Sequence, residues 1–122
     1  MDGTVNFFRP WSDYKNGFGN SSGEFFIGLE RLHLLTNSRP YELLIVMLGQ
    51  KFSTYDQDND EYEKACANEF TGAWWYKACH HSNLNGRYLK GTTVEYAQAV
   101  NWYQFKGHNY SLKFVEMTIR PR

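Results

Sequence analysis

The most regular pattern of apolar and polar positions lies between residues 24 and 37. Apolar residues recur there at Phe26, Leu29, Leu32 and Leu35, and a polar residue closes the run at position 37. This spacing is close to that of one face of an α-helix. The pattern therefore predicts a helix over residues 24–37 that turns an apolar face toward a core.

Shorter patterns predict the other elements. Residues 4–8 alternate weakly and predict a strand, whereas residues 12–19 begin with a candidate capping residue, Ser12, and end in glycine, which indicates a short helix. The apolar run at residues 41–48 is typical of a buried strand. Residues 110–121 alternate clearly and predict a terminal strand.

Long irregular stretches separate these elements. Residues 80–114 contain little periodicity, and glycine and asparagine mark turns in them. Long loops inside a compact domain usually carry function. We therefore expect an α+β fold with long ordered loops.

Composition narrows the possible functions. The chain has 122 residues, which suits one domain, and 18% of them are aromatic, which predicts an aromatic-rich core or an aromatic-lined pocket. The formal net charge is zero, so no basic excess favours nucleic acid as a partner. The longest apolar stretch, residues 43–48, is far too short to cross a bilayer, and the first residues do not read as an export signal. We expect no membrane insertion, and either an intracellular chain or one whose export signal is not in this sequence.

Two cysteines, Cys66 and Cys79, allow two interpretations. Their spacing suits one local disulfide in an oxidising compartment, and equally two free thiols in a cytosolic protein. The triplets that begin at Asn20 and Asn109 fit the N-glycosylation pattern. These candidate glycosylation sites shift the balance toward an extracellular glycoprotein.

An acidic loop precedes the first cysteine. Five carboxylates fall within eight positions: Asp56, Asp58, Asp60, Glu61 and Glu63. Alternating aspartates in a bent loop can supply several oxygen ligands to Ca²⁺. The EF-hand pattern fails, because Glu61 replaces the required glycine and Ala67 the final glutamate. A different hard-cation site and a solvated charge run both stay open, whereas nothing marks a carboxylate pair for acid–base chemistry.

The adjacent Cys79, His80 and His81 do not indicate a catalytic or zinc site. No second Cys or His pair at zinc-ligand spacing accompanies them. Catalytic Cys–His pairs usually meet through the fold, so adjacency in sequence is weak evidence. The chain also lacks a recognisable nucleophile–base set and a phosphate-binding glycine loop. We therefore expect a protein that is not an enzyme.

Four stretches together closely resemble one family. They are residues 2–36, 51–60, 66–89 and 110–121, and the acidic loop, the cysteine pair around a Trp-Trp and the segment NLNGRY follow one another in the family's order. The family is that of fibrinogen C-terminal domains, which includes ficolins, tachylectins, angiopoietins, tenascins and the fibrinogen chains. The ficolin- and tachylectin-like members are the most similar. The resemblance implies a short twisted antiparallel sheet, few short helices and a loop-rich C-terminal subdomain.

The resemblance implies a calcium site in the acidic loop. Its positions fall on the side chains of Asp58 and Asp60 and on the backbone carbonyls of Tyr62 and Lys64, with Ca²⁺ as the expected cofactor. Asp56 is then expected to support the loop. The other carboxylates of the loop are expected to face solvent.

The resemblance also implies a Cys66–Cys79 disulfide and a ligand site beside it. The peptide bond between Ala78 and Cys79 is often cis in the family, and lectin members bind acetyl groups next to it. The expected ligand-binding residues are Phe70, Ala78, Cys79, His80, Tyr96 and Ala97. Phe70 lacks the hydroxyl of the tyrosine that lectins often have, whereas a small residue such as Ala97 is typical of acetyl binders.

The chain departs from the family in length. We expect a single partial domain over residues 1–122, in which residues 1–50 are a remnant of the N-terminal and central parts and residues 51–122 form the calcium and ligand subdomain. Upstream strands with their disulfide, and several dozen central residues before the acidic loop, have no counterpart. Oligomerisation through a missing upstream region is expected.

The expected function is calcium-dependent, lectin-like recognition of acetylated carbohydrate or other acetyl-bearing ligands in innate immunity, by a secreted protein. One alternative is a receptor-binding module of the angiopoietin or tenascin type, whose partner is a cell-surface or extracellular protein. The other is a shortened product without independent activity.

Overall fold

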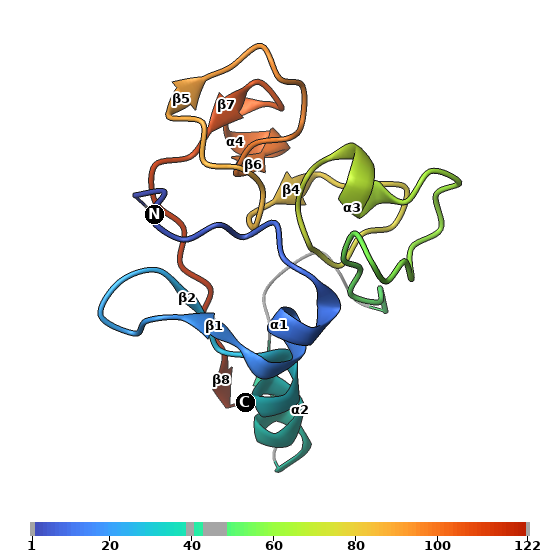
Figure 1. Cartoon of the computed structure of the whole chain (residues 1–122), viewed down its shortest axis with the longest axis vertical. Helices are drawn as coiled ribbons and strands as arrows, with labels where there is room; N and C mark the ends of the chain where they lie inside the picture. Colours follow the sequence, from blue (N-terminus) through green and yellow to red (C-terminus); the bar gives the residue numbers. More distant parts are fainter. Residues whose placement is uncertain (1, 39–40, 43–48, 122) are drawn as a thin grey trace.

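A computed structural model describes residues 2–38, 41–42 and 49–121 (Figure 1). The elements in chain order are α1 (Trp11–Asn16), β1 (Phe18–Gly19), β2 (Phe25–Phe26), α2 (Leu29–Ser38), β3 (Tyr41–Glu42), α3 (Cys66–Glu69), β4 (Ser82–Asn83), β5 (Gly91–Thr92), β6 (Asn101–Trp102), α4 (Tyr103–Lys106), β7 (Tyr110–Ser111) and β8 (Arg120–Pro121). The strands form antiparallel pairs, β1 with β2, β3 with β8, β4 with β6 and β5 with β7. The expected α+β class with short helices and short antiparallel sheets is therefore confirmed.

Both N-terminal helices differ from their predicted limits. Helix α2 begins at Leu29 instead of residue 24, because Phe25–Phe26 pair with β1 and Gly28 then turns the chain with a φ of 103°. A Cβ at Gly28 would lie 2.8 Å from backbone atoms of Asn16, so a larger residue does not fit this turn. Helix α1 begins directly after Pro10, not at Ser12, because the fixed φ of proline suits a helix start.

The three predictions for strands are met only in part. Residues 4–8 form no strand within the described part of the chain. Residues 43–48 of the predicted buried strand lie outside the described residues, and the preceding β3 pairs with β8. Residues 110–121 form strands only at their two ends, β7 and β8.

Two hydrophobic clusters form the core, and aromatic side chains dominate both. The first joins the N-terminal segment to the middle of the chain through Phe7, Tyr14, Phe26, Phe52 and Ala73. The second lies under the C-terminal loops and consists of Cys66, Ala67, Trp74, Tyr76 and Leu84. Trp75 packs against both clusters. Trp75 thus connects the cluster near α1 and α2 with the cluster under the C-terminal loops, at the two ends of the molecule in Figure 1.

Tyr14 offers a test of this core. Its hydroxyl donates to the Phe7 carbonyl at 2.7 Å, and the same carbonyl also accepts the Arg9 N–H at 3.0 Å. Because Tyr14→Phe leaves that carbonyl with one donor, we expect a loss of only about 1 kcal/mol in the free energy of unfolding. Urea denaturation would measure it. The control Tyr55→Phe, at an exposed ring, should change stability by less than about 0.5 kcal/mol, and an equal loss in both variants would contradict the prediction.

Within the described residues, no helix is long and apolar enough to cross a membrane.

Candidate functional site

Hydrogen bonds fold the acidic loop back on itself around Asp60. The Asp60 N–H donates to Asp58 Oδ1 at 3.1 Å, and the two Asp60 carboxylate oxygens accept the N–H groups of Tyr62 at 2.9 Å and Cys66 at 3.0 Å. The loop therefore places the two predicted calcium-binding side chains together and ties them to the start of α3. The other two predicted ligands, the carbonyls of Tyr62 and Lys64, lie in the same turn.

The two carboxylates lie in an environment that favours a cation. Burial raises the pKa of Asp60, and the adjacent Asp58 raises it further, although backbone hydrogen bonds from Tyr62 and Cys66 act in the opposite direction. None of the ion pairs between described residues involves either aspartate. Within the described chain, no group of three or more His, Cys, Asp or Glu side chains could hold a metal ion. A cation here would therefore need backbone carbonyls in addition to the two carboxylates.

Asp56 supports the loop from its other side. Its Oδ1 accepts the Thr54 hydroxyl at 2.7 Å and the backbone N–H of Trp11 at 2.8 Å. Burial acts to raise the pKa of Asp56, but these hydrogen bonds outweigh it and lower the pKa. Asp56 thus joins the acidic loop to the first residue of α1.

A disulfide connects the acidic loop to the predicted ligand site. Cys66 and Cys79 are joined with their Cα atoms 5.6 Å apart, and the Ala78–Cys79 peptide bond is cis. The Glu61 N–H also donates to the Lys77 carbonyl at 3.0 Å. The disulfide and the Glu61–Lys77 hydrogen bond therefore connect the acidic loop directly to residues 77–80, so a loss of mobility in the loop would also restrict these residues.

Aromatic and histidine rings gather beyond the disulfide. His80 lies 4.9 Å from Phe70 and 5.5 Å from His108, and Tyr96 lies 5.1 Å from His108, as measured between ring centroids. The Ala97 N–H donates to the His108 carbonyl at 3.0 Å. We call these five residues the aromatic–histidine cluster.

The cluster includes one residue that the sequence did not reveal. His108 contacts both His80 and Tyr96, yet it lies in an irregular segment with no spacing relation to either. The other four members were all predicted, and the fold brings them together from the residue after α3, the segment before β4 and the long loop before β6. The two candidate glycosylation sites lie apart from one another, on exposed turns at Asn20 and Asn109.

His80 is neutral and has free hydrogen-bonding capacity. Burial is the main cause that lowers the pKa of His80 to about 4; the neighbouring His108 and His81 act in the same direction, whereas the backbone of Ala97 acts in the opposite one. Within the described residues, both ring nitrogens of His80 are buried and neither has a hydrogen-bond partner. Buried polar atoms normally have partners, so these two nitrogens indicate a place for a ligand or a water molecule.

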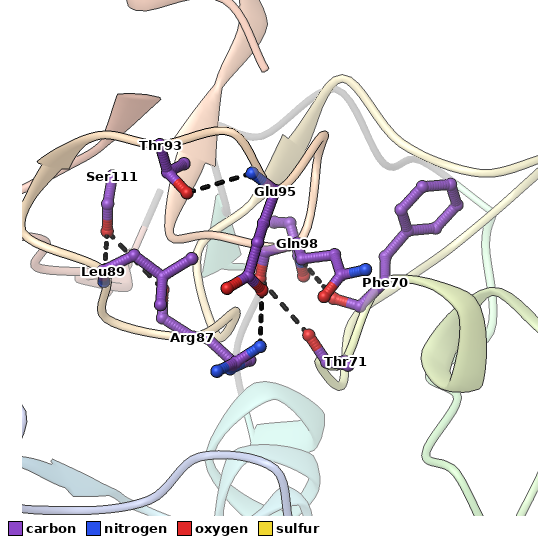
Figure 2. A network of polar contacts seen from close by, with 9 residues as sticks. Phe70, Thr71, Arg87, Leu89, Thr93, Glu95, Gln98 and Ser111 are labelled. Carbon is purple, nitrogen blue, oxygen red and sulfur yellow. Dashed lines mark hydrogen bonds and ion pairs between the residues drawn. The ribbon is translucent and has the colours of Figure 1, made fainter. Parts of the chain in front are cut away.

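A polar network holds the loop that carries Tyr96 and Ala97 (Figure 2). Arg87 pairs with Glu95 at 2.5 Å, and the Thr71 hydroxyl donates to the Gln98 carbonyl at 3.5 Å. The Arg87–Glu95 pair holds the start of the segment 95–98, and the Thr71–Gln98 hydrogen bond holds its end against the residue that follows Phe70. The network therefore positions Tyr96 and Ala97 relative to Phe70 in the aromatic–histidine cluster.

Comparison with known proteins identifies the family. The profile of the family described as "Fibrinogen beta and gamma chains, C-terminal globular domain" matches residues 1–48 and 47–122. The chain is 38% identical to Fibrinogen C domain-containing protein 1 of Xenopus tropicalis, with 99% of the chain and 37% of that protein covered. It is also 38% identical to Ryncolin-4 of Cerberus rynchops, with 100% of the chain and 48% of that protein covered. This chain belongs to the fibrinogen C-terminal domain family, as predicted, and spans less than half the length of these two relatives.

Solved structures agree with this assignment. The fibrinogen-like globe domain of human ANGPTL2 matches with a TM-score of 0.92 and 36% identity, over 99% of this chain and 76% of that one. Lamprey fibrin D-dimer, in complex with the peptide Gly-His-Arg-Pro-amide, matches with a TM-score of 0.80 and 25% identity, over 97% and 56% of the two chains. The chain therefore has the fibrinogen-like globe fold.

Proposed function

We propose that the chain is a non-catalytic, calcium-dependent recognition module that binds acetylated carbohydrate at the aromatic–histidine cluster. The observation that carries this proposal is His80, a partly buried neutral imidazole whose two ring nitrogens are buried and both unpaired within the described residues. It lies between the rings of Phe70 and His108. This combination of apolar walls with a few convergent polar atoms is typical of small-molecule sites.

The chemistry of an acetamido group fits these residues. Its methyl group can pack against the Phe70 and Tyr96 rings, and its carbonyl can accept a hydrogen bond from a neutral imidazole N–H. The second imidazole nitrogen can accept a hydrogen bond from the amide N–H or a sugar hydroxyl. Ala97 contributes no bulk that would compete for the same space.

Calcium would be held by the side chains of Asp58 and Asp60 and the carbonyls of Tyr62 and Lys64. The proximity of the two carboxylates, the raised pKa of Asp60 and the absence of an ion-pair partner among the described residues all support this proposal. Bound calcium would neutralise the two like charges. The stiffened loop would then affect ligand affinity through the disulfide, by preorganisation instead of direct contact.

An extracellular location is part of the same proposal. The Cys66–Cys79 disulfide is typical of oxidising compartments. The relative called Microfibril-associated glycoprotein 4, from Mus musculus, is 38% identical over 98% of this chain. Asn20 and Asn109 are exposed and could carry glycans.

A receptor-binding module is the second candidate function. Exposed aromatic side chains follow the cluster along β6 and α4, where Trp102, Tyr103 and Phe105 are 48%, 54% and 67% exposed. Aromatic residues are enriched at the centres of protein interfaces. The peptide-bound fibrin neighbour also fits a protein or peptide partner.

Calorimetric titration with N-acetylglucosamine and glucosamine separates these candidates. We expect N-acetylglucosamine to bind in calcium and glucosamine to bind at least tenfold more weakly, since glucosamine lacks the acetyl group. His80→Ala should lower the affinity for N-acetylglucosamine about tenfold, the equivalent of one hydrogen bond of about 1.4 kcal/mol.

His33→Ala, at an exposed histidine of α2, is the matched control and should bind as the wild type does. Equal affinity for the two sugars would contradict acetyl recognition without relying on any variant. Absence of sugar binding together with binding to an extracellular protein would favour the second candidate.

A further inference from the structure

An apolar groove lies outside the aromatic–histidine cluster and shares no lining residue with it. It has a volume of about 780 Å³ and lies between β2, α2 and the segment before β8. Its apolar lining includes Phe25, Leu29, Leu32, Trp75, Val115 and Met117. The proposed function uses none of these residues.

One wall of the groove is the segment 115–119, which is not paired with a strand among the described residues. Val115, Met117 and Ile119 are partly buried, whereas Glu116 and Thr118 between them are exposed, which is the alternation of a strand with one covered face. Within the described residues, the backbone of residues 115–119 makes no hydrogen bond to another backbone group. An extended segment with free N–H and C=O groups is a template for pairing with another strand.

A buried amide at the groove also lacks a donor. Asn85 lines the groove and is 1% exposed, and its Nδ2 donates to the Ala73 carbonyl at 3.0 Å. No hydrogen-bond donor reaches its Oδ1 within the described residues. A fully buried amide oxygen normally has a donor, so this atom is available to accept a hydrogen bond from a group or a water molecule in the groove.

The comparisons show a stretch that relatives have and this chain lacks. The alignment with Ryncolin-4 spans 165 positions although the chain has 122 residues, a difference of 43 positions that have no counterpart here. The family profile matches in two pieces that meet at residues 47–48, which places the missing stretch at that point. The last described element before it, β3, pairs with β8, which directly follows residue 119. In sequence the missing stretch thus follows β3, and β3 pairs with the strand that adjoins the groove wall.

We propose that the groove binds, in trans, the stretch that longer family members carry at the 47–48 junction. A strand of that stretch would pair with residues 115–119, place apolar side chains between α2 and Trp75, and offer a donor to Asn85 Oδ1. The partner is thus a strand-forming apolar segment of another fibrinogen C-terminal domain. A second copy of this chain is not the occupant, because it lacks the same stretch. This inference does not depend on sugar or calcium binding.

A synthetic peptide of the 43-position stretch of Ryncolin-4 tests the proposal with the full 122-residue chain. Titration should give one peptide per chain, and a scrambled peptide of the same composition should not bind. Hydrogen exchange on the wild type should show new protection of the amides of residues 115–119, a readout that needs no variant. Absence of binding, or binding without this protection, overturns the proposal.

Paired lysine substitutions locate the site. Met117→Lys puts a charge into the apolar wall and should weaken peptide binding at least tenfold, whereas Thr118→Lys, at the adjacent exposed position, should leave it unchanged. Equal affinity in the two variants counts against the groove. Light scattering that finds a dimer of the free chain, with residues 115–119 already protected, shows that a second copy is the occupant and also overturns the proposal.

Discussion

Saturating calcium is expected to stabilise the wild-type chain by about 3 kcal/mol and to leave the Asp60→Asn variant almost unchanged. A ligand at about 100 times its dissociation constant stabilises the state that binds it by about 2.7 kcal/mol. For a domain of this size, that gain raises the melting temperature by about 10 °C. The effect arises because calcium removes the repulsion between Asp58 and Asp60, which burial intensifies. Calorimetric melting curves in calcium and in chelator measure it.

A matched control separates a specific site from general charge effects. Glu63→Gln removes one negative charge from the same loop, at an exposed position that is not a predicted ligand, and should keep the full calcium response. Asp60→Asn also weakens the bonds to the Tyr62 and Cys66 N–H groups, so the comparison concerns the increment due to calcium and not the starting stability. A wild type that does not respond to calcium, or a Glu63→Gln variant that loses the response, would refute the site.

The sequence predicted the fold class and much of the helical content, but not the element limits. The spacing from Phe26 to Leu35 correctly indicated a helix, yet the helix begins only at Leu29 because strand pairing of Phe25–Phe26 and the turn at Gly28 intervene. Pairing depends on a partner strand elsewhere in the chain. Strands of two residues are also too short for alternation to be recognised.

The terminal segment shows what alternation does and does not report. Residues 110–121 have a clear strand pattern, and burial does alternate from Val115 to Ile119, but only β7 and β8 have partners among the described residues. The pattern records which face is covered. It cannot record whether the neighbouring strand is present in the same chain.

The candidate site also contains residues that could be predicted from the sequence and one that could not. Phe70, His80, Tyr96 and Ala97 were expected from the resemblance alone, and the fold brings them together. His108 could not be expected, because no local pattern relates it to His80, and only the turn after α4 places the two rings 5.5 Å apart. Residues that meet through long loops have no periodic signature.

Acid should destabilise the chain through His80. The folded pKa of about 4 lies below the ordinary histidine pKa of 6.5, so the unfolded chain binds the proton more readily than the folded chain does. Neutral His80 therefore makes its full contribution to the free energy of unfolding above about pH 6.5. This contribution, about 3 kcal/mol in total, is lost as the pH falls toward 4. Burial is the main cause, and the neighbouring His108, whose own pKa burial and His81 also lower, adds a smaller loss in the same direction.

Urea denaturation between pH 4 and pH 7.5 measures this dependence. His80→Gln cannot take up the proton, so its stability should fall much less over this range, even if it begins lower than the wild type. His33→Gln, at an exposed histidine that contacts Asn37 at 2.9 Å, should follow the wild-type curve. Asp60 opposes the trend, because a carboxyl with a raised pKa favours the folded state as the pH falls, and both variants retain that contribution equally. The same slope in His80→Gln and His33→Gln would therefore mean that His80 is not the buried neutral group on which the proposed ligand site depends.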